Sequence, residues 1–138
     1  MPARRYLTVH DDGLAQSWAG MVWMNPPVWM NPPYSRAIEW ARRWTAHGDG
    51  VALISVSGSP WVAELCERAA VFCFASNLDF VTPTGARTEI PWPTFMAAAG
   101  GGTVGLLELA RVQNWPVFSR RRHRARPGEP MSFREVAR

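Results

Sequence analysis

Asn31, Pro32, Pro33 and Tyr34 are the residues whose types and spacing best support chemistry. The side-chain carbonyl of Asn31 and a proline backbone carbonyl are acceptors that can both face one planar amino group. When both hydrogens of a base's exocyclic amine are bonded to acceptors that prolines hold rigidly, the nitrogen can pyramidalise and direct its lone pair at an electrophile. Tyr34 can stack on the face of a base that has been flipped from its duplex. The tetrad therefore predicts a site that acts on the amino group of a base.

Elements on both sides of the tetrad must hold it in place. Asn-Pro-Pro predicts a loop, because proline lacks a donor and restricts the residue before it. Before the loop, Met21–Met24, or Trp29–Met30 in a second register, predicts a short buried strand. After the loop, Ser35 can cap an amphipathic helix over Arg36–His47. The tetrad would then follow the carboxyl end of a parallel strand, where open α/β sheets bind their ligands.

Further strands and helices alternate along the chain. The order strand, helix, strand, helix, strand predicts a parallel α/β sheet with right-handed crossovers. The expected strands are Arg5–Val9, Val51–Val56, Val71–Phe74 and Thr94–Ala99; the expected helices run from Ser59-Pro60 to near Ala70 and over about Val104–Gln113; and Asn77–Trp92 is expected to be rich in loops.

Composition indicates one packed domain with a basic end. A chain of 138 residues with 47% hydrophobic content is long and apolar enough to form a core, which excludes disorder throughout. All 15 basic residues are arginine and the formal net charge is +4, which permits a polyanionic partner without showing one. We expect a methyltransferase-like domain over residues 1–118, by the resemblance described below, and a basic, flexible tail over residues 119–138.

The cysteines and the length of the apolar runs predict the cellular compartment of the protein. Cys66 and Cys73 fit no metal or redox pattern and are predicted to be buried thiols in a reducing compartment. No apolar run has the length of a signal peptide, and none approaches the roughly 20 residues of a membrane span. Together these observations predict a cytoplasmic protein that uses no metal and does not bind a membrane.

The residues around the tetrad resemble those of a known family. The runs DDGLAQSWAGMVWMNPP, NPPYSRAIEW and GVALISVSGSPWVAELCERAAVFCF are similar to the phage-type DNA N6-adenine methyltransferases of the Dam type. That family carries a D-G-L, W, G, V-W-x-N-P-P-Y-S, W pattern before an apolar strand and a tryptophan-containing helix. The resemblance spans about Asp11 to Phe74, with weaker support from EIPWPTFM.

The resemblance implies a fold, a cofactor and a substrate. It implies an S-adenosylmethionine-dependent enzyme with a Rossmann-like α/β sheet, incomplete at the N-terminus of this chain. Asp12 in D-G-L would face the adenine of the cofactor, and Asn31, Pro32, Pro33 and Tyr34 would form the catalytic tetrad. The methyl group would pass directly and in line from the sulfonium to adenine N6, and double-stranded DNA would be the partner.

A six-residue repeat makes two copies of Asn-Pro-Pro candidates for this role. VWMNPP occupies residues 22–27 and again residues 28–33. The first copy, with Asn25, has the family's spacing from Trp18 and Gly20, whereas the second continues into Tyr34 and a helix. We favour the second copy, because stacking needs the aromatic ring and the helix fixes the exit of the loop. The extra six residues would then bulge upstream of Asn31.

Other functions stay open at the level of sequence. NPPY also occurs in methyltransferases that act on RNA bases or on glutamine side chains, and a catalytically inactive remnant would bind nucleic acid through its arginines alone. Trp40, Trp44 and Trp61 lie at core-facing helical positions, which favours packing over base stacking. The sequence indicates neither the DNA recognition site nor the oligomeric state.

Overall fold

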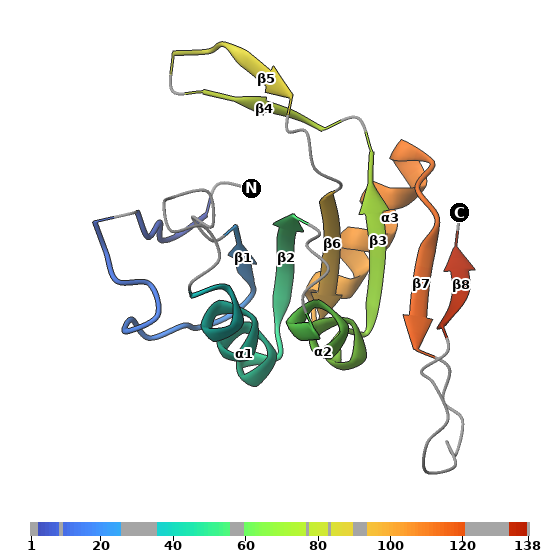
Figure 1. The fold of residues 1–138 in the computed structure, drawn as a ribbon, viewed down its shortest axis with the longest axis horizontal. Helices are drawn as coiled ribbons and strands as arrows, with labels where there is room; N and C mark the ends of the chain where they lie inside the picture. The colour runs from blue at the N-terminus through green and yellow to red at the C-terminus, as the bar shows by residue number, and fades with distance from the viewer. Residues whose placement is uncertain are drawn as a thin grey trace.

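The computed structural model describes residues 3–8, 10–25, 36–55, 60–76, 78–82, 84–89, 94–120 and 133–137. These residues form three helices, a six-stranded mixed sheet and a two-stranded hairpin (Figure 1). The helices are α1 (Ala37–His47), α2 (Pro60–Arg68) and α3 (Gly102–Gln113). The strands are β1 (Val22–Met24), β2 (Gly50–Ser55), β3 (Val71–Ala75), β4 (Asp79–Val81), β5 (Arg87–Glu89), β6 (Thr94–Ala99), β7 (Val117–Arg120) and β8 (Phe133–Ala137).

The large sheet has the strand order β1-β2-β6-β3-β7-β8. β1 and β2 are parallel, whereas β6 runs antiparallel between β2 and β3. β1, β2 and β3 therefore share one direction and end at the same edge of the sheet (Figure 1). The prediction of a parallel sheet is wrong for β6, and the strands β7 and β8, which were not predicted, also pair antiparallel with their neighbours. The described residues between β3 and β6 contain a hairpin instead of a crossover helix, and strands joined without a crossover pair antiparallel.

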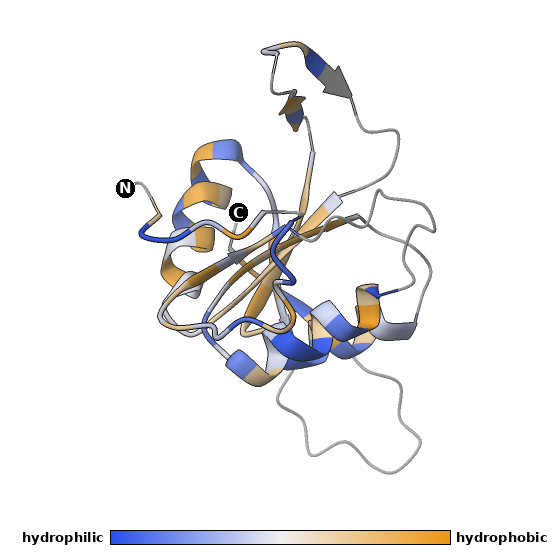
Figure 2. Ribbon diagram, turned by 90° about the vertical axis from the view of Figure 1, so that its left-hand side faces the viewer, coloured by the Kyte–Doolittle hydropathy of each residue, from blue (hydrophilic) through white to orange (hydrophobic). Residues whose placement is uncertain are grey.

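Helices cover both faces of the sheet, with α1 and α2 on one face and α3 on the other (Figure 2). Two clusters of buried side chains fill the layers. Under α1 and α2 the largest fully buried side chains are Trp44, Phe95 and Leu65. Trp44 and Trp61 belong to this cluster and Trp40 packs against it, which confirms the packing interpretation of these three tryptophans.

The C-terminal strands include residues from the segment that the sequence predicted to be a tail. β7 pairs with β3 and β8 pairs with β7, so the part of residues 119–138 that the structure describes belongs to the sheet. Phe133 in β8 packs edge-on against Phe72, with ring centroids 5.1 Å apart, and Phe72 stacks on Phe118 at 5.7 Å. Burial of these rings offsets the conformational entropy that is lost when the segment becomes ordered. The arginine-rich composition of the segment had predicted a flexible tail.

Other local expectations meet mixed outcomes. Residues 5–8 form no strand, and the expected strand's last residue, Val9, lies outside the described residues. α1 begins at Ala37 with Arg36 at its cap position and no side-chain cap bond, one residue later than expected. The proposed cap residue, Ser35, also lies outside the described residues. The predicted strands at the positions of β2, β3 and β6 and the helix at α3 are confirmed to within two residues at each end.

Glycines let backbone segments approach each other closely at the amino end of β2. Gly50 has φ 144°, and a Cβ there would overlap the backbone carbonyl of Val22 in β1. Gly102 at the start of α3 lies against the backbone of Gly50 in the same way. The backbone N–H of Gly101 donates to Asp49 Oδ1 at 2.8 Å. The Gly100–Gly102 run is thus explained by packing of α3 onto the turn before β2.

Both cysteines are free and buried, on different faces of the sheet. Burial raises the pKa of each thiol to about 11 from 9.0. We expect iodoacetamide at pH 8 to modify both cysteines slowly in the folded protein and rapidly in urea, because the thiolate is the reactive species. Labelling is followed by mass spectrometry, and rapid labelling of the native protein would contradict this expectation.

The raised pKa values of the two thiols also predict how stability depends on pH. Because each thiol loses its proton at a higher pH in the folded protein than in the unfolded chain, the free energy of unfolding should be constant below about pH 9 and fall as the pH rises toward 11.

None of the helices described is long and apolar enough to cross a membrane. In the same part of the chain, no group of three or more histidine, cysteine, aspartate or glutamate side chains is placed to hold a metal ion.

Candidate functional site

The first copy of the repeat provides strand β1. Val22, Trp23 and Met24 pair in parallel with Gly50, Val51 and Ala52, so the structure shows the first of the two registers that the sequence permitted. Asn25 follows directly at the carboxyl end of β1 and is exposed. Residues 26–35, which include the whole predicted tetrad Asn31–Tyr34, lie outside the described residues. The structure thus fixes the two ends between which the tetrad must lie, Asn25 and Arg36.

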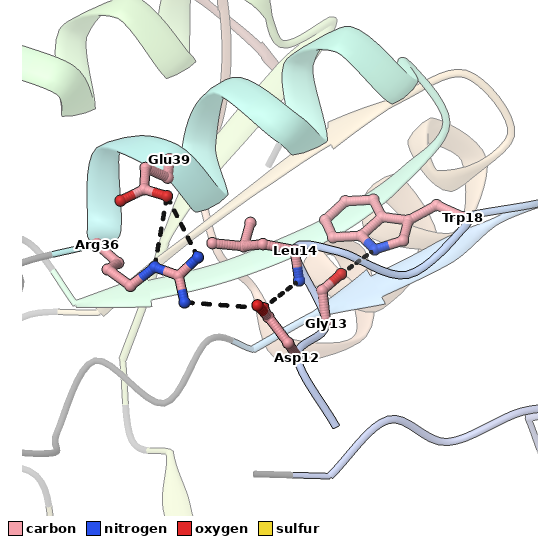
Figure 3. A network of polar contacts seen from close by, with 6 residues as sticks. All are labelled: Asp12, Gly13, Leu14, Trp18, Arg36 and Glu39. Atoms are coloured by element: carbon pink, nitrogen blue, oxygen red, sulfur yellow. Dashed lines mark hydrogen bonds and ion pairs between the residues drawn. The ribbon is translucent and has the colours of Figure 1, made fainter. Parts of the chain in front are cut away.

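Asp12 lies beside the downstream end of that connection (Figure 3). Its Oδ1 accepts the backbone N–H of Leu14 at 3.2 Å and is 3.7 Å from Nη1 of Arg36. The Asp12 side chain is 55% exposed, so its carboxylate is open to a ligand. Residues 10 and 11 form a turn before Asp12, and the expected preceding strand is not formed by residues 5–8.

Arg36 connects Asp12 to the first turn of α1. Its Nε and Nη2 contact Oε2 of Glu39 at 3.4 and 3.3 Å while Nη1 faces Asp12 (Figure 3). All three side chains are about half exposed, so each ion pair contributes at most about 1 kcal/mol. The main effect of Arg36 is to position Asp12 relative to Glu39, because its planar guanidinium contacts both carboxylates. The sequence predicted Arg36 only as the first residue of an amphipathic helix.

Trp18 fixes the D-G-L segment against α1. Its Nε1 donates to the carbonyl of Gly13 at 2.8 Å (Figure 3). Its ring also stacks on Trp40, with ring centroids 6.1 Å apart. The guanidinium carbon of Arg43 lies 5.5 Å from the centroid of the Trp18 ring. A Cβ at position 13 would lie 2.6 Å from the Trp40 ring, which explains why glycine follows Asp12. The glycine and tryptophans of the sequence pattern therefore position Asp12.

Hydrogen bonds fasten the same segment at further points. His47 contacts the carbonyl of Gly20 at 2.7 Å through Nε2, and Arg43 donates to the carbonyl of Gln16 at 2.8 Å. Asp11 accepts from both the backbone N–H and the hydroxyl of Thr8 at 2.8 Å. Hydrogen bonds from the Thr8 backbone and side chain lower the pKa of Asp11, so this turn is held by an ionised carboxylate. The two acidic residues thus have different roles, with Asp11 closing the turn and Asp12 facing α1.

These residues suit the nucleoside end of a cofactor. An exposed carboxylate is an acceptor for an exocyclic amine or for hydroxyl groups. Oδ1 of Asp12 contacts the turn and Arg36, and Oδ2 has no hydrogen-bond or ion-pair partner among the described residues. The described residues therefore offer a cofactor one acceptor, the carboxylate of Asp12, which lies between the end of β1 and the start of α1.

The connection between β1 and α1 is long for its kind. Residues 25–36 join the two elements, whereas such connections in α/β units have roughly two to six residues. Deleting residues 25–30 removes one copy of the repeat and joins Met24 directly to Asn31. We expect this variant to fold and to be more stable by about 0.6 kcal/mol, because closing a loop of half the length costs less entropy. Urea denaturation measures this difference, and a loss of stability would show that the first Asn-Pro-Pro packs on the domain.

Comparisons with known proteins place the chain in a family. The curated proteins and the solved structures gave no match. Residues 2–89 match the family described as DNA N-6-adenine-methyltransferase (Dam). That range contains Asp12, the Trp18 contacts, β1, α1 and the connection that carries the tetrad, and it confirms the resemblance drawn from the sequence. Because the match covers more than half of the chain, the protein belongs to the DNA N-6-adenine-methyltransferase (Dam) family.

Proposed function

We propose that this protein transfers a methyl group from S-adenosylmethionine to N6 of an adenine in double-stranded DNA. The observation that carries the proposal is the placement of an exposed Asp12 carboxylate beside the end of the connection that holds Asn-Pro-Pro-Tyr. A cofactor-binding acceptor and an amine-binding tetrad must lie close together for direct transfer, because reacting atoms have to approach to roughly 3 to 3.5 Å.

The sheet supports this proposal through its topology. β1 and β2 are neighbouring parallel strands joined through α1, and the carboxyl ends of β1, β2 and β3 lie at one edge. Ligands of open α/β sheets bind outside the carboxyl ends of the strands. We infer a Rossmann-like arrangement in which Asn25 and the residues after it lie at this edge.

The chain's own residues would act mainly by positioning. S-adenosylmethionine supplies an activated methyl group, so no covalent intermediate on the protein is required. Asp12 would hold the adenine end of the cofactor. The Asn31 side-chain carbonyl and the backbone carbonyl of Pro32 would accept both hydrogens of the adenine amine, and Tyr34 would stack on the flipped base. Developing positive charge on the amine nitrogen would strengthen these hydrogen bonds in the transition state and so lower the barrier to transfer.

The test is methyl transfer from S-adenosylmethionine labelled in its methyl group. The purified chain is incubated in turn with duplex DNA, with RNA and with unfolded protein, and the labelled product is digested and identified. We expect label in N6-methyladenine from DNA only. Label in RNA or in glutamine would replace the proposed substrate, and a folded protein that binds DNA but transfers no label would be the inactive remnant.

A further inference from the structure

Helix α3 presents apolar side chains to solvent. Val104 and Val112 are 71% and 66% exposed, although the helix packs on the sheet through Leu106 and Ala110. Among the described helices, α3 alone covers its face of the sheet (Figure 2). Valine forms helices less readily than alanine, so within one copy the two exposed valines are less favourable than alanine would be. A contact with another molecule would bury them.

Two charged residues lie on the same exposed side of α3. Glu108 follows Val104 by four residues, and Arg111 follows Glu108 by three. Spacings of four and three keep side chains on one side of a helix, as in the seam of a coiled coil. Both charged side chains are exposed, and neither has a hydrogen-bond or ion-pair partner among the residues that the structure describes. The exposed side of α3 therefore carries one unpaired charge of each sign.

These charges determine how a second copy of α3 could pack against the first. In a parallel pair, residues of equal number are level, so Glu108 would face Glu108 and Arg111 would face Arg111. Like charges that face each other across an interface oppose binding. In an antiparallel pair related by a two-fold axis, Glu108 can be level with Arg111 of the second copy, and the same contact then occurs twice. This register also places the partly exposed Leu107 level with Val112 of the second copy.

We propose that the chain forms a two-fold symmetric dimer through α3, with the helices antiparallel and Glu108 of each copy paired with Arg111 of the other. The partner is a second copy because the exposed side of α3 is complementary to itself, both in charge and in the placement of its apolar residues. Contacts between Leu107 and Val112 contribute most of the affinity, since exposed ion pairs contribute little and mainly fix register and direction. The dimer goes beyond the function proposed above and does not depend on it.

The size of α3 limits the strength of this dimer. The helix has 12 residues, which corresponds to a length of about 18 Å. An interface between two such helices is small compared with the interfaces of stable complexes, so the dimer should be weak and should dissociate on dilution. Association must therefore be measured over a wide range of protein concentration.

The antiparallel arrangement leaves the candidate site of each copy open. β6 ends at Ala99 and α3 begins at Gly102, so α3 runs back along the sheet, antiparallel to β6 and in the direction of β1 and β2 (Figure 1). When two α3 helices pack antiparallel, the carboxyl ends of β1 in the two copies face opposite ends of the dimer. Neither copy then covers the edge of the sheet at which Asn25 lies in the other.

The experiment exchanges the two charges of α3 and measures association by sedimentation equilibrium. We expect wild type to show a reversible equilibrium between monomer and dimer. Glu108→Arg and Arg111→Glu each place like charges opposite one another at both symmetric contacts, so each should weaken association roughly 10- to 100-fold. The double variant with both substitutions restores opposite charges and should associate within about threefold of wild type.

Glu64→Arg is the matched control, because it makes the same change in net charge on a different helix. Glu64 is exposed in α2, which lies on the other face of the sheet (Figure 2). This variant should associate as wild type does. Circular dichroism confirms that all the variants are folded, as expected for substitutions at exposed helical positions.

Four outcomes would overturn the proposal. Wild type could remain monomeric at every concentration, which would leave α3 without a second copy as its partner. Glu108→Arg could dimerise as strongly as wild type, which would place the interface elsewhere. The double variant could fail to restore association, or Glu64→Arg could weaken it as much as Glu108→Arg does. Sedimentation requires neither DNA nor methyl transfer, so a failure of the proposed reaction leaves this test unaffected.

Discussion

Replacing Asn31 by alanine should lower the rate of methyl transfer by roughly 100- to 1000-fold, the effect of removing one preorganised polar contact from a reacting centre. The substitution removes the side-chain carbonyl that would accept a hydrogen of the adenine amine. Binding of S-adenosylmethionine should be unchanged, because its proposed contact is Asp12. The loss should therefore fall on kcat, and it is measured with labelled cofactor under saturating DNA.

Asn25→Ala is the matched control, because it makes the same substitution in the other copy of the repeat. Asn25 is exposed directly after β1, so its replacement should change neither folding nor transfer. If activity is instead lost only in Asn25→Ala, the first Asn-Pro-Pro is the catalytic copy. Loss in both variants would mean that each asparagine has a part in the site.

Gly50→Ala should be the most destabilising single-methyl change in the described part of the chain. Gly50 has φ 144°, and an added Cβ would overlap the Val22 carbonyl across the β1–β2 pair. Strain at such a φ and overpacking against a backbone each cost about 1 to 3 kcal/mol, so we expect the free energy of unfolding to fall by roughly 3 to 5 kcal/mol. Urea denaturation with linear extrapolation measures the change. Because Gly50 pairs with Val22, the variant should also loosen β1 and lower methyl transfer.

The same substitution at Gly105 should have the opposite sign. Gly105 is exposed in α3, and apart from its chain neighbours and the backbone of its own helix no atom lies within 4 Å of the position that its Cβ would take. Alanine is favoured over glycine in a helix interior by roughly 0.5 to 1 kcal/mol, so Gly105→Ala should stabilise the protein. A change of less than 1 kcal/mol for Gly50→Ala would show that β1 can move away from β2 without cost.

Sequence patterns predicted the helices and central strands because their signals are local. The apolar stripe with Ala41 and Trp44 predicts α1, and the continuous apolar run of β2 predicts a strand buried on both faces. Strand direction is not a local property, and nothing in Thr94–Ala99 indicates that it would run antiparallel between β2 and β3. The strand β8 was missed because its stability comes from distant partners, chiefly Phe133 packing on Phe72.

The contacts that support the candidate site could not be predicted from the sequence. The tetrad and Asp12 follow from the family pattern, and the match over residues 2–89 confirms the family. The contact of Arg36 with Asp12 joins parts of the chain far apart in sequence, as does that of Trp18 with Trp40. The sequence separation of the residues predicts neither contact, because each contact depends on how the segment before β1 folds back over α1. The hairpin was read as loop because Pro83 and Gly85 dominate the composition of its tip.

The duplication of VWMNPP means that residues 28–30 have the same sequence as β1 and could pair with β2 in its place. A shift by one copy moves the strand by six residues, an even number, so every side chain returns to the same face and Met30 would replace Met24. The contact of His47 with Gly20 and the start of α1 at Ala37 hold the chain on either side. The total length between these anchors is the same in both arrangements, and their pairing with β2 involves identical side chains. In the shifted arrangement the spare six residues would lie before the strand instead of after it, and Asn31 would take the place that Asn25 occupies here.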